Sequence, residues 1–333
     1  MKNRLFFSFA AASLLSMAAC GGGSGASGAS AGAARADDVS DAGVPAAPRG
    51  PAHRLTFPHP PAALSTDSAR LNYVLDHFWD SFDRCDTTWI ADTAALEQAF
   101  ADWTGVLRYV SEPKAVQSIG EFFRSTEASP PVRDRLLEVA EHYLYDPNSP
   151  MRNETQYIAV LQYAVASPAI ADADKIRPRA QLKMACKNRP GMVAADFAYT
   201  TPDGRTKRLH DLRGERTLLL FYNPGCPECA RAEEFIATSP VLGPLIAEGA
   251  LKVLAVYADG DLKAWREHLP QMPAGWTVAC DKENRIIEAS LYDLRAIPCI
   301  FLLDAEKRVI LKDASAPRVE AWLAAAQKQD QGR

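Results

Sequence analysis

The sequence is short of cysteine, of excess charge of one sign and of long apolar runs. Seven cysteines in 333 residues are too few for a fold held together by disulfides. Lys plus Arg number 37 and Asp plus Glu number 41, a net charge of −4, so the basic excess of a dedicated nucleic-acid binder is missing. No segment beyond the N-terminus has 18 uninterrupted apolar residues, so no transmembrane helix is predicted there. These absences leave a chain with a few functional thiols.

The composition nevertheless supports real hydrophobic cores. Hydrophobic residues make up 47% of the chain and charged residues 23%, which is ordinary for a globular protein and excludes disorder over the whole length. At about 150 residues per domain, the length predicts roughly two domains.

The N-terminus has the layout of an export signal. Lys2 and Arg4 precede an apolar run over 5–17, and small residues lead to Cys20. The segment LSMAAC resembles the lipobox of bacterial lipoproteins, although Met17 replaces the usual Leu. This resemblance implies a signal peptide over 1–19, removed before Cys20, and a diacylglycerol anchor on that cysteine. The alternative is an ordinary signal peptide in which the cysteine is incidental.

A flexible tether is expected over 20–52. The stretch GGGSGASGASAGAARA after Cys20 has no large apolar residue and cannot bury a core. A tether that begins at a lipidated cysteine holds the rest of the chain beside a membrane. We therefore expect a protein of the cell envelope whose body faces the periplasm, an oxidising compartment.

Residues 53–190 read as an all-α domain. Leu71, Val74, Leu75 and Phe78 follow one another in steps of three and four, which is one face of a helix that Ser65 or Thr66 can cap. The same periodicity predicts further helices over 96–110, 113–125, 131–145, 153–165 and 171–187.

The helical region is rich in aromatic side chains, which predict either core stripes or a binding groove. At helical spacing the core is the favoured interpretation. The residues in question are Phe78, Trp79, Phe82, Trp89, Trp103, Phe122 and Phe123. The acidic and histidine residues here do not form a dense ligand pattern, so no metal site is expected. Cys85 and Cys186 read as buried single thiols, with mutual pairing as the alternative.

Residues 191–333 alternate strands with helices, which predicts an α/β domain. Expected strands cover 197–200 and 206–209 around a Pro202-Asp203-Gly204 hairpin turn, and also 217–222, 251–257, 300–303 and 309–311. Expected helices cover 230–238, 261–269 and 317–327.

The chemistry lies in a Cys-x-x-Cys motif directly after the first buried strand. Cys226 and Cys229 stand at the start of a helix, where unpaired N–H groups stabilise a thiolate. Cys226 is therefore the expected nucleophile, Cys229 the resolving thiol, and the two form a redox-active disulfide. Half a zinc site and a structural disulfide are the alternatives, but no second ligand pair is evident. No metal or cofactor is expected.

A proline at the start of a later strand supports this interpretation. Pro298 follows Ile297 in the segment AIPCI, and proline is unusual there unless its bond geometry is needed. Residues 191–325 resemble the TlpA/ResA-type thioredoxin-like domains in the ADF opening, the PDG turn, the CxxC, the IP pair and LLDAEKRV. The resemblance implies that Pro298 is cis and lies against Cys226, and that the backbone of Ile297 pairs with a substrate chain.

The chain departs from that pattern at several places. Gly225 replaces the usual Trp before the first cysteine, and Cys299 replaces the Thr after the proline. Leu220 stands where thioredoxin has a buried acid, so the proton acceptor for the resolving thiol would be Glu228, Glu233 or water. Cys299 reads as a buried strand residue or as a third thiol of the site.

The two residues between the cysteines predict a reductant. Pro227 shapes the turn without offering an N–H. Glu228 places a negative charge near Cys226, which should raise the thiol pKa and remove stabilisation from the reduced form. We therefore expect a pair nearer to thioredoxin than to the strong oxidants.

The whole arrangement resembles bacterial lipoproteins that join an uncharacterised helical domain to a redox domain. The sequence predicts a membrane-tethered thiol–disulfide oxidoreductase that reduces exported client proteins. A membrane thiol reductase would supply its electrons, and no nucleic-acid partner is expected. The alternative is a binding or scaffold lipoprotein in which the helical domain recognises a partner. A peroxidase is a third option, but peroxiredoxins carry Thr where this chain has Asn223.

Overall fold

The computed structural model describes residues 53–331. The expected signal peptide, the lipidation site Cys20 and the tether over 20–52 lie outside the described residues. The described chain belongs to one compact unit, Gly50–Arg333. None of the described helices is long and apolar enough to cross a bilayer.

Side chains cap the first turns of some of the helices in the helical region. Thr66 accepts a hydrogen bond from the Ala69 N–H at 3.2 Å, and Asn153 accepts one from the Gln156 N–H at 3.1 Å. The helices described in this region are α1 (Asp67–His77), α2 (Thr88–Ala91), α3 (Thr93–Leu107), α4 (Glu112–Ser125), α5 (Pro130–Leu144), α6 (Glu154–Ala166) and α7 (Ile176–Ala185). The short α2 was not expected, and α7 begins later than expected because residues 171–175 form turns.

The aromatic side chains of this region form its core. Trp79 stacks on Phe122 with ring centroids 4.3 Å apart and meets Phe82 edge to face at 5.2 Å. All seven aromatic residues singled out above are buried. The core interpretation is therefore confirmed, and the interpretation of these side chains as a binding groove is wrong.

The rest of the chain folds around one seven-stranded mixed sheet with the order β2-β1-β5-β4-β3-β6-β7. The central strands β3, β4 and β5 are parallel, and the outer pairs are antiparallel. The strands are β1 (Ala198–Thr200), β2 (Thr206–Arg208), β3 (Arg216–Tyr222), β4 (Leu251–Tyr257), β5 (Thr277–Cys280), β6 (Cys299–Leu303) and β7 (Val309–Leu311).

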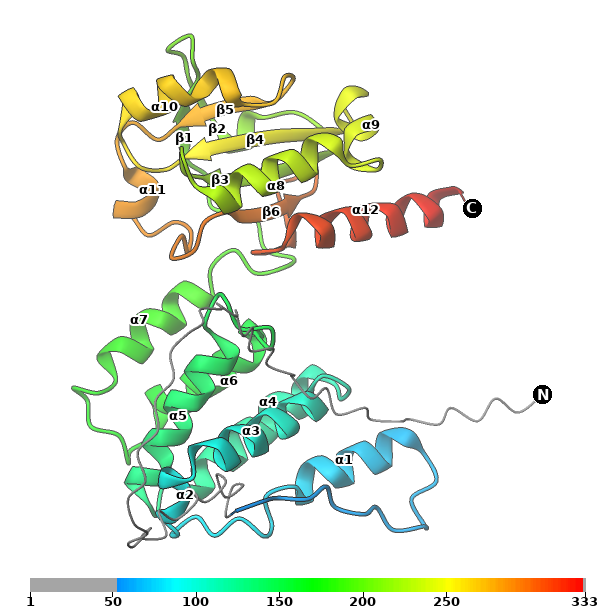
Figure 1. Ribbon diagram of the computed structural model, residues 1–333, viewed down its shortest axis with the longest axis vertical. Helices are drawn as coiled ribbons and strands as arrows, with labels where there is room; N and C mark the ends of the chain where they lie inside the picture. The colour runs from blue at the N-terminus through cyan, green and yellow to red at the C-terminus, as the bar shows by residue number, and fades with distance from the viewer. Residues whose placement is uncertain (1–52, 332–333) are drawn as a thin grey trace, which may run out of the picture. The chain divides into compact units, whose positions relative to one another are not determined.

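Helices and connecting segments bury both faces of this sheet. The helices are α8 (Pro227–Thr238), α9 (Leu242–Ala247), α10 (Leu262–His268), α11 (Arg285–Glu288) and α12 (Ala316–Gln331), with 3₁₀ turns at Leu209–Asp211 and Leu269–Gln271. The helices α8 and α12 lie side by side on one face (Figure 1). The expectation of a helical region followed by an α/β fold is confirmed, while β5, α9 and α11 are short elements that the pattern did not predict.

Strand alternation divides the core of this fold into two clusters. Leu218, Leu220 and Tyr222 of β3 point to the face covered by α8, α9, α10 and α12. Leu219 and Phe221 point to the opposite face, where Phe197 and Tyr292 are packed. Successive side chains of a strand point to opposite faces of the sheet. Neighbouring residues of β3 and of β6 therefore pack in different core clusters.

Candidate active site

The Cys-x-x-Cys motif lies at the junction of β3 and α8. Cys226 is the N-cap of α8, and its Sγ accepts a hydrogen bond from the Cys229 N–H at 3.2 Å. A sulfur held at a helix N-terminus is stabilised as a thiolate by the unpaired N–H groups and the helix dipole. Pro227 follows at the first helical position, where its missing N–H costs nothing.

Gly225 is explained by the backbone that leads into this cap. Its φ of 75° lies in the left-handed region, which residues with a side chain rarely adopt. Space is not the constraint, because a Cβ built on Gly225 would have no neighbouring atom within 4 Å. The turn that presents Cys226 therefore requires the glycine that replaces the usual tryptophan.

The Ile297–Pro298 segment lies against the nucleophile. The Ile297–Pro298 peptide bond is cis, as the resemblance implied. The Ile297 carbonyl oxygen lies 4.0 Å from the Cys226 Sγ, so the thiol can donate to it. The fold thus brings together the two sequence segments that were expected to form the site.

The two thiols have different surroundings. Cys226 is half-buried, whereas Cys229 is only 1% exposed. Burial raises the pKa of Cys229 most, and its hydrogen bond with Cys226 raises it further. Cys229 therefore keeps its proton at neutral pH and needs a base before it can act as a resolving nucleophile.

Glu233 is the carboxyl group that shares a cavity with Cys229. It stands four residues further along α8, on the same helix face, and both line a cavity of about 150 Å³ that Cys226 also borders. Glu233 is 6% exposed, and its Oε1 has no hydrogen-bond partner among the described residues. Burial raises its pKa to about 7. A carboxyl group with this pKa can accept and return a proton near neutral pH.

Two further polar side chains near this site were missed by sequence reasoning. His268, at the end of α10, lines the same cavity, and burial lowers its pKa. The Tyr222 hydroxyl at the end of β3 is buried and feels the charge of Glu233. His268 Nε2 has no hydrogen-bond partner in the part of the chain that the structure describes. To identify Tyr222 from the sequence, one would have had to predict that the side chain of the last residue of strand 217–222 lies on the sheet face that α8 covers.

Glu228 does not face the cavity. Its side chain is exposed and forms an ion pair with Arg231, one turn further along α8, with Oε2 3.0 Å from Nε. Of the two carboxyl groups considered as proton acceptors, the geometry favours Glu233. The guanidinium of Arg231 also balances part of the charge by which Glu228 was expected to act on Cys226.

The remaining cysteines lie away from this site or outside its chemistry. Cys299 is fully buried in the cluster on the opposite sheet face, with its Sγ 3.7 Å from the Asp293 carbonyl oxygen. Burial raises its pKa well above the usual range, so the strand-residue interpretation holds. Cys280 is buried and unpaired. Cys85 and Cys186 are exposed and unpaired, so the expectation that they are buried was wrong.

No group of three or more His, Cys, Asp or Glu side chains among residues 53–331 could hold a metal ion. The site as described brings together two thiols, a buried carboxyl group and the backbone carbonyl of Ile297. Such a constellation on a mixed sheet defines a thioredoxin-like fold with a dithiol site.

Comparison with known proteins agrees with this class. Residues 190–312 match the AhpC/TSA family, and residues 32–188 match a domain of unknown function, DUF5106. The chain is 38% identical to a thioredoxin-like protein of known crystal structure from Bacteroides caccae, with 81% of this chain and 98% of that chain covered and a TM-score of 0.79. The protein belongs to this thioredoxin-like family.

Curated relatives connect the redox domain to thiol–disulfide exchange. The thiol-disulfide oxidoreductase ResA of Geobacillus thermodenitrificans is 24% identical over 119 residues, and ResA of Geobacillus kaustophilus matches equally. The match covers 36% of this chain and 66% of each relative, just under two thirds of their length. The C-terminal domain is therefore a homologue of thiol–disulfide oxidoreductases.

Proposed function

We propose that this protein is a lipid-anchored thiol–disulfide oxidoreductase that reduces exported proteins in the periplasm. The observation that carries the proposal is the position of Cys226. Cys226 is the N-cap of α8. Its Sγ accepts a hydrogen bond from the Cys229 N–H at 3.2 Å and lies 4.0 Å from the Ile297 carbonyl oxygen. That arrangement offers a nucleophile, a resolving thiol and a backbone edge for an extended client segment.

The reaction would proceed in two exchange steps. The Cys226 thiolate attacks one sulfur of a client disulfide, which forms a mixed disulfide and releases the first client sulfur as a thiolate that takes up a proton. Cys229 then gives its proton to Glu233 and attacks the Cys226 sulfur. The bond between Cys226 and the client breaks, the second client sulfur leaves as a thiolate that takes up the proton held by Glu233, and the Cys226–Cys229 disulfide remains.

Two electrons pass from the enzyme dithiol to the client in this sequence. The oxidised enzyme then needs a dithiol donor to return to its starting state. We infer a membrane thiol reductase as that donor, because the periplasm keeps no reducing thiol pool of its own.

Reduction of insulin disulfides by the full-length protein, with dithiothreitol as donor, tests the activity. The Cys229→Ser variant should accumulate covalent complexes with clients in envelope extracts, and Cys226→Ser should not. Equal trapping by both variants or by neither would contradict the assignment. Consumption of hydrogen peroxide without insulin reduction would indicate a peroxidase, and neither activity would leave the scaffold alternative.

The anchor has a separate test. One acyl chain binds membranes only weakly, so stable anchoring requires the diacylglycerol unit that a lipobox cysteine would carry. Cys20→Ala should release the protein from the membrane fraction and change its processed mass. A variant that stays in the membrane fraction with unchanged processing would refute the anchor.

A further inference from the structure

The helical region contacts the segment that precedes Pro298. This segment, residues 290–297, is called the client loop below, because its last residue offers a carbonyl beside Cys226. Asn188 Nδ2 donates to the Leu291 carbonyl at 2.9 Å, and the Lys187 ammonium donates to the Ser290 carbonyl. Two consecutive residues after α7 thus hold two consecutive carbonyls at the start of the client loop.

A second contact holds the client loop near its middle. The Arg295 guanidinium carbon lies 3.2 Å from the ring centroid of Tyr145, the C-cap of α5. Tyr145 is itself stacked on Tyr157 of α6, with ring centroids 4.5 Å apart. A guanidinium over an aromatic face is attracted by the ring quadrupole, most strongly where water is excluded. The side chain of Arg295 is only 25% exposed.

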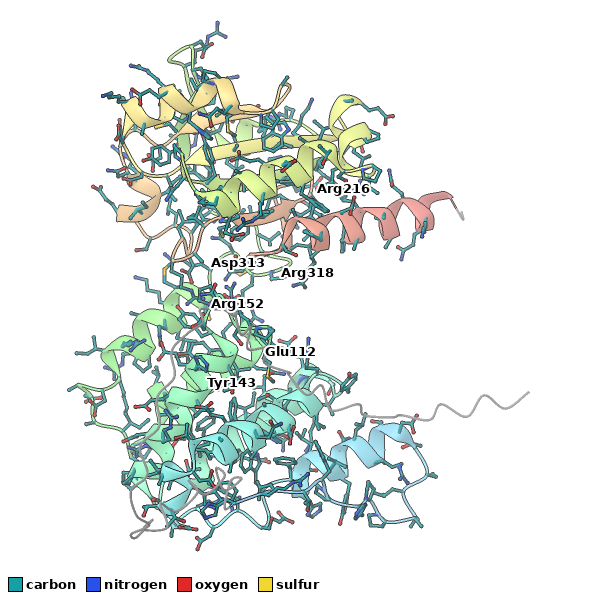
Figure 2. The ribbon with its side chains drawn as sticks, in the orientation of Figure 1. Glu112, Tyr143, Arg152, Arg216, Asp313 and Arg318 are labelled. Atoms are coloured by element: carbon teal, nitrogen blue, oxygen red, sulfur yellow. The ribbon has the colours of Figure 1, made fainter. Side chains whose placement is uncertain are left out.

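A third contact holds the turn between β7 and α12. Lys312 Nζ lies 2.8 Å from a Glu154 carboxylate oxygen and donates to the Ala185 and Lys187 carbonyls at 3.0 and 2.8 Å. Arg152 forms an ion pair with Asp313, the next residue along, and Figure 2 labels both side chains. The Ala314 N–H bonds to the Ile300 carbonyl at 3.0 Å, which connects this turn to β6 just beyond Pro298.

The backbone is strained where these contacts are made. Asn188, Ser290 and Asp313 have φ values of 50°, 49° and 47°. Together they are three of the five non-glycine residues with positive φ in the described part of the chain. Asn and Asp adopt this region more readily than other residues with a side chain, so Ser290 is the position where the surroundings must do most to hold the backbone.

The client loop is anchored on its other side by the redox domain. The Tyr292 hydroxyl donates to the Ala195 carbonyl at 2.6 Å, and the same Ala195 gives its N–H to Asn188 Oδ1 at 2.8 Å. The loop is therefore held from both sides up to Arg295, and Ile297 follows two residues later.

We propose that the helical region is a positioning brace for the client loop: through Asn188, Tyr145 and Arg152 it sets where the Ile297 carbonyl lies beside Cys226. This inference rests on the proposed function for its consequence, because a misplaced client loop would impair exchange with protein clients. The brace itself is a property of the fold and can be measured without any activity. The helical region thereby acquires a role in the redox site although none of its residues touches the reacting sulfurs.

Hydrogen exchange of the client-loop amides in the full-length protein tests the brace. Tyr145→Leu removes the aromatic face and should speed exchange over 290–297 by about 10-fold, since local opening follows the lost contact energy. Tyr145→Phe keeps the face and should exchange like the wild type. Tyr109→Leu is the matched control, because Tyr109 is 74% exposed in the same region. Unchanged client-loop exchange in Tyr145→Leu would overturn the proposal.

A second variant tests the contact between Asn188 and the start of the client loop. Asn188→Gly keeps the positive φ but removes the hydrogen bonds to Leu291 and Ala195. It should speed client-loop exchange by a similar factor and lower kcat/KM for insulin by about 5- to 10-fold, while alkylation of Cys226 by a small reagent changes less than about 2-fold. Equal losses with insulin and the small reagent would mean a general loss of folding and would refute a positioning role.

These readouts separate the two proposals. If the wild-type protein reduces no insulin but Tyr145→Leu loosens the client loop, the proposed function fails and the brace stands. If insulin is reduced and neither variant changes exchange or kcat/KM, the function stands and the brace fails.

Discussion

Cys229 and Cys299 are both buried, but they pack on opposite faces of the central sheet. Cys229 packs on the face of Tyr222, beside a cavity that also contains the buried carboxyl group of Glu233. Cys299 packs on the other face, in the cluster that contains Tyr292 and Phe301. In the β3–β6 ladder, Cys299 pairs with Phe221, the neighbour of Tyr222. Cys229 lies on α8 against the face of Tyr222, whereas Cys299 lies on β6 with its side chain on the face of Phe221.

The surroundings of the two thiols also differ in their polar groups. Cys229 shares a cavity with Glu233 and His268, whose Oε1 and Nε2 atoms lack hydrogen-bond partners among residues 53–331. Cys299 instead meets the Asp293 carbonyl at 3.7 Å within an aromatic cluster. Buried polar groups without partners are costly, and Glu233 is one that lies where the proposed proton transfer would use it.

Replacing each thiol by serine should give opposite results. Cys226→Ser removes the nucleophile and should abolish insulin reduction, a loss of at least about 10³-fold. Cys299→Ser should keep kcat within about 2-fold, because its effect is confined to packing on the other face. Steady-state turnover at equal protein concentration measures both, with circular dichroism as the check on folding. A Cys299→Ser variant that is folded but inactive would break the comparison.

Glu233→Gln should slow release of the client from the mixed disulfide by about 10- to 100-fold at pH 7.5, because Cys229 loses its base. In the wild type this step should rise with pH through about 7, where Glu233 ionises. In the variant that rise should disappear, and the rate should increase only at alkaline pH as Cys229 ionises unaided. Stopped-flow release from pH 5.5 to 9 measures it. Glu234→Gln, at an exposed neighbour, is the control and should retain the wild-type profile.

The same substitution should change how stability depends on pH. Burial raises the pKa of Glu233 from 4.5 to about 7, so the folded state holds a proton that the unfolded chain loses. Stability should therefore fall as pH rises from about 4.5 to about 7 and then level off. Glu233→Gln removes this loss and should be more stable than the wild type by up to about 3 kcal/mol at pH 8, with little difference at pH 4.

Urea unfolding of the reduced proteins at the two pH values measures this difference. A stability gain of equal size at pH 4 and pH 8 would show that ionisation of Glu233 has no part in it.

The smallest effect is expected at Glu228. Glu228→His removes a negative charge near Cys226 and should move the reduction potential in the oxidising direction, by less than about 30 mV because Arg231 already balances part of that charge. Arg231→Ala exposes the carboxylate and should move it the other way. Redox titration against dithiothreitol measures both. A potential near the strong oxidants, or shifts of the opposite sign, would contradict the electrostatic argument.

Much of the fold was predictable because its determinants are local. The apolar spacing that begins at Leu71 defines the first helix, and Thr66 caps it as expected. The buried runs of β3 and β4 were identified within one residue at either end. β5 was missed because four residues between Trp276 and Asp281 offer too short a pattern. Its place in the sheet depends on β4 and β1, which lie far away in sequence.

The features of the candidate active site also fall into two groups, those that short segments determine and those that depend on contacts between distant segments. The sequence alone determined the Cys226–x–x–Cys229 pair at a helix start and the proline that meets it, because spacing and backbone chemistry are properties of short segments. Only the tertiary structure decided that Glu233 rather than Glu228 shares a cavity with Cys229, that Cys299 faces away, and that the helical region contacts residues 290–297. Each of these depends on burial and on strand register, which contacts between distant segments create and no local pattern contains.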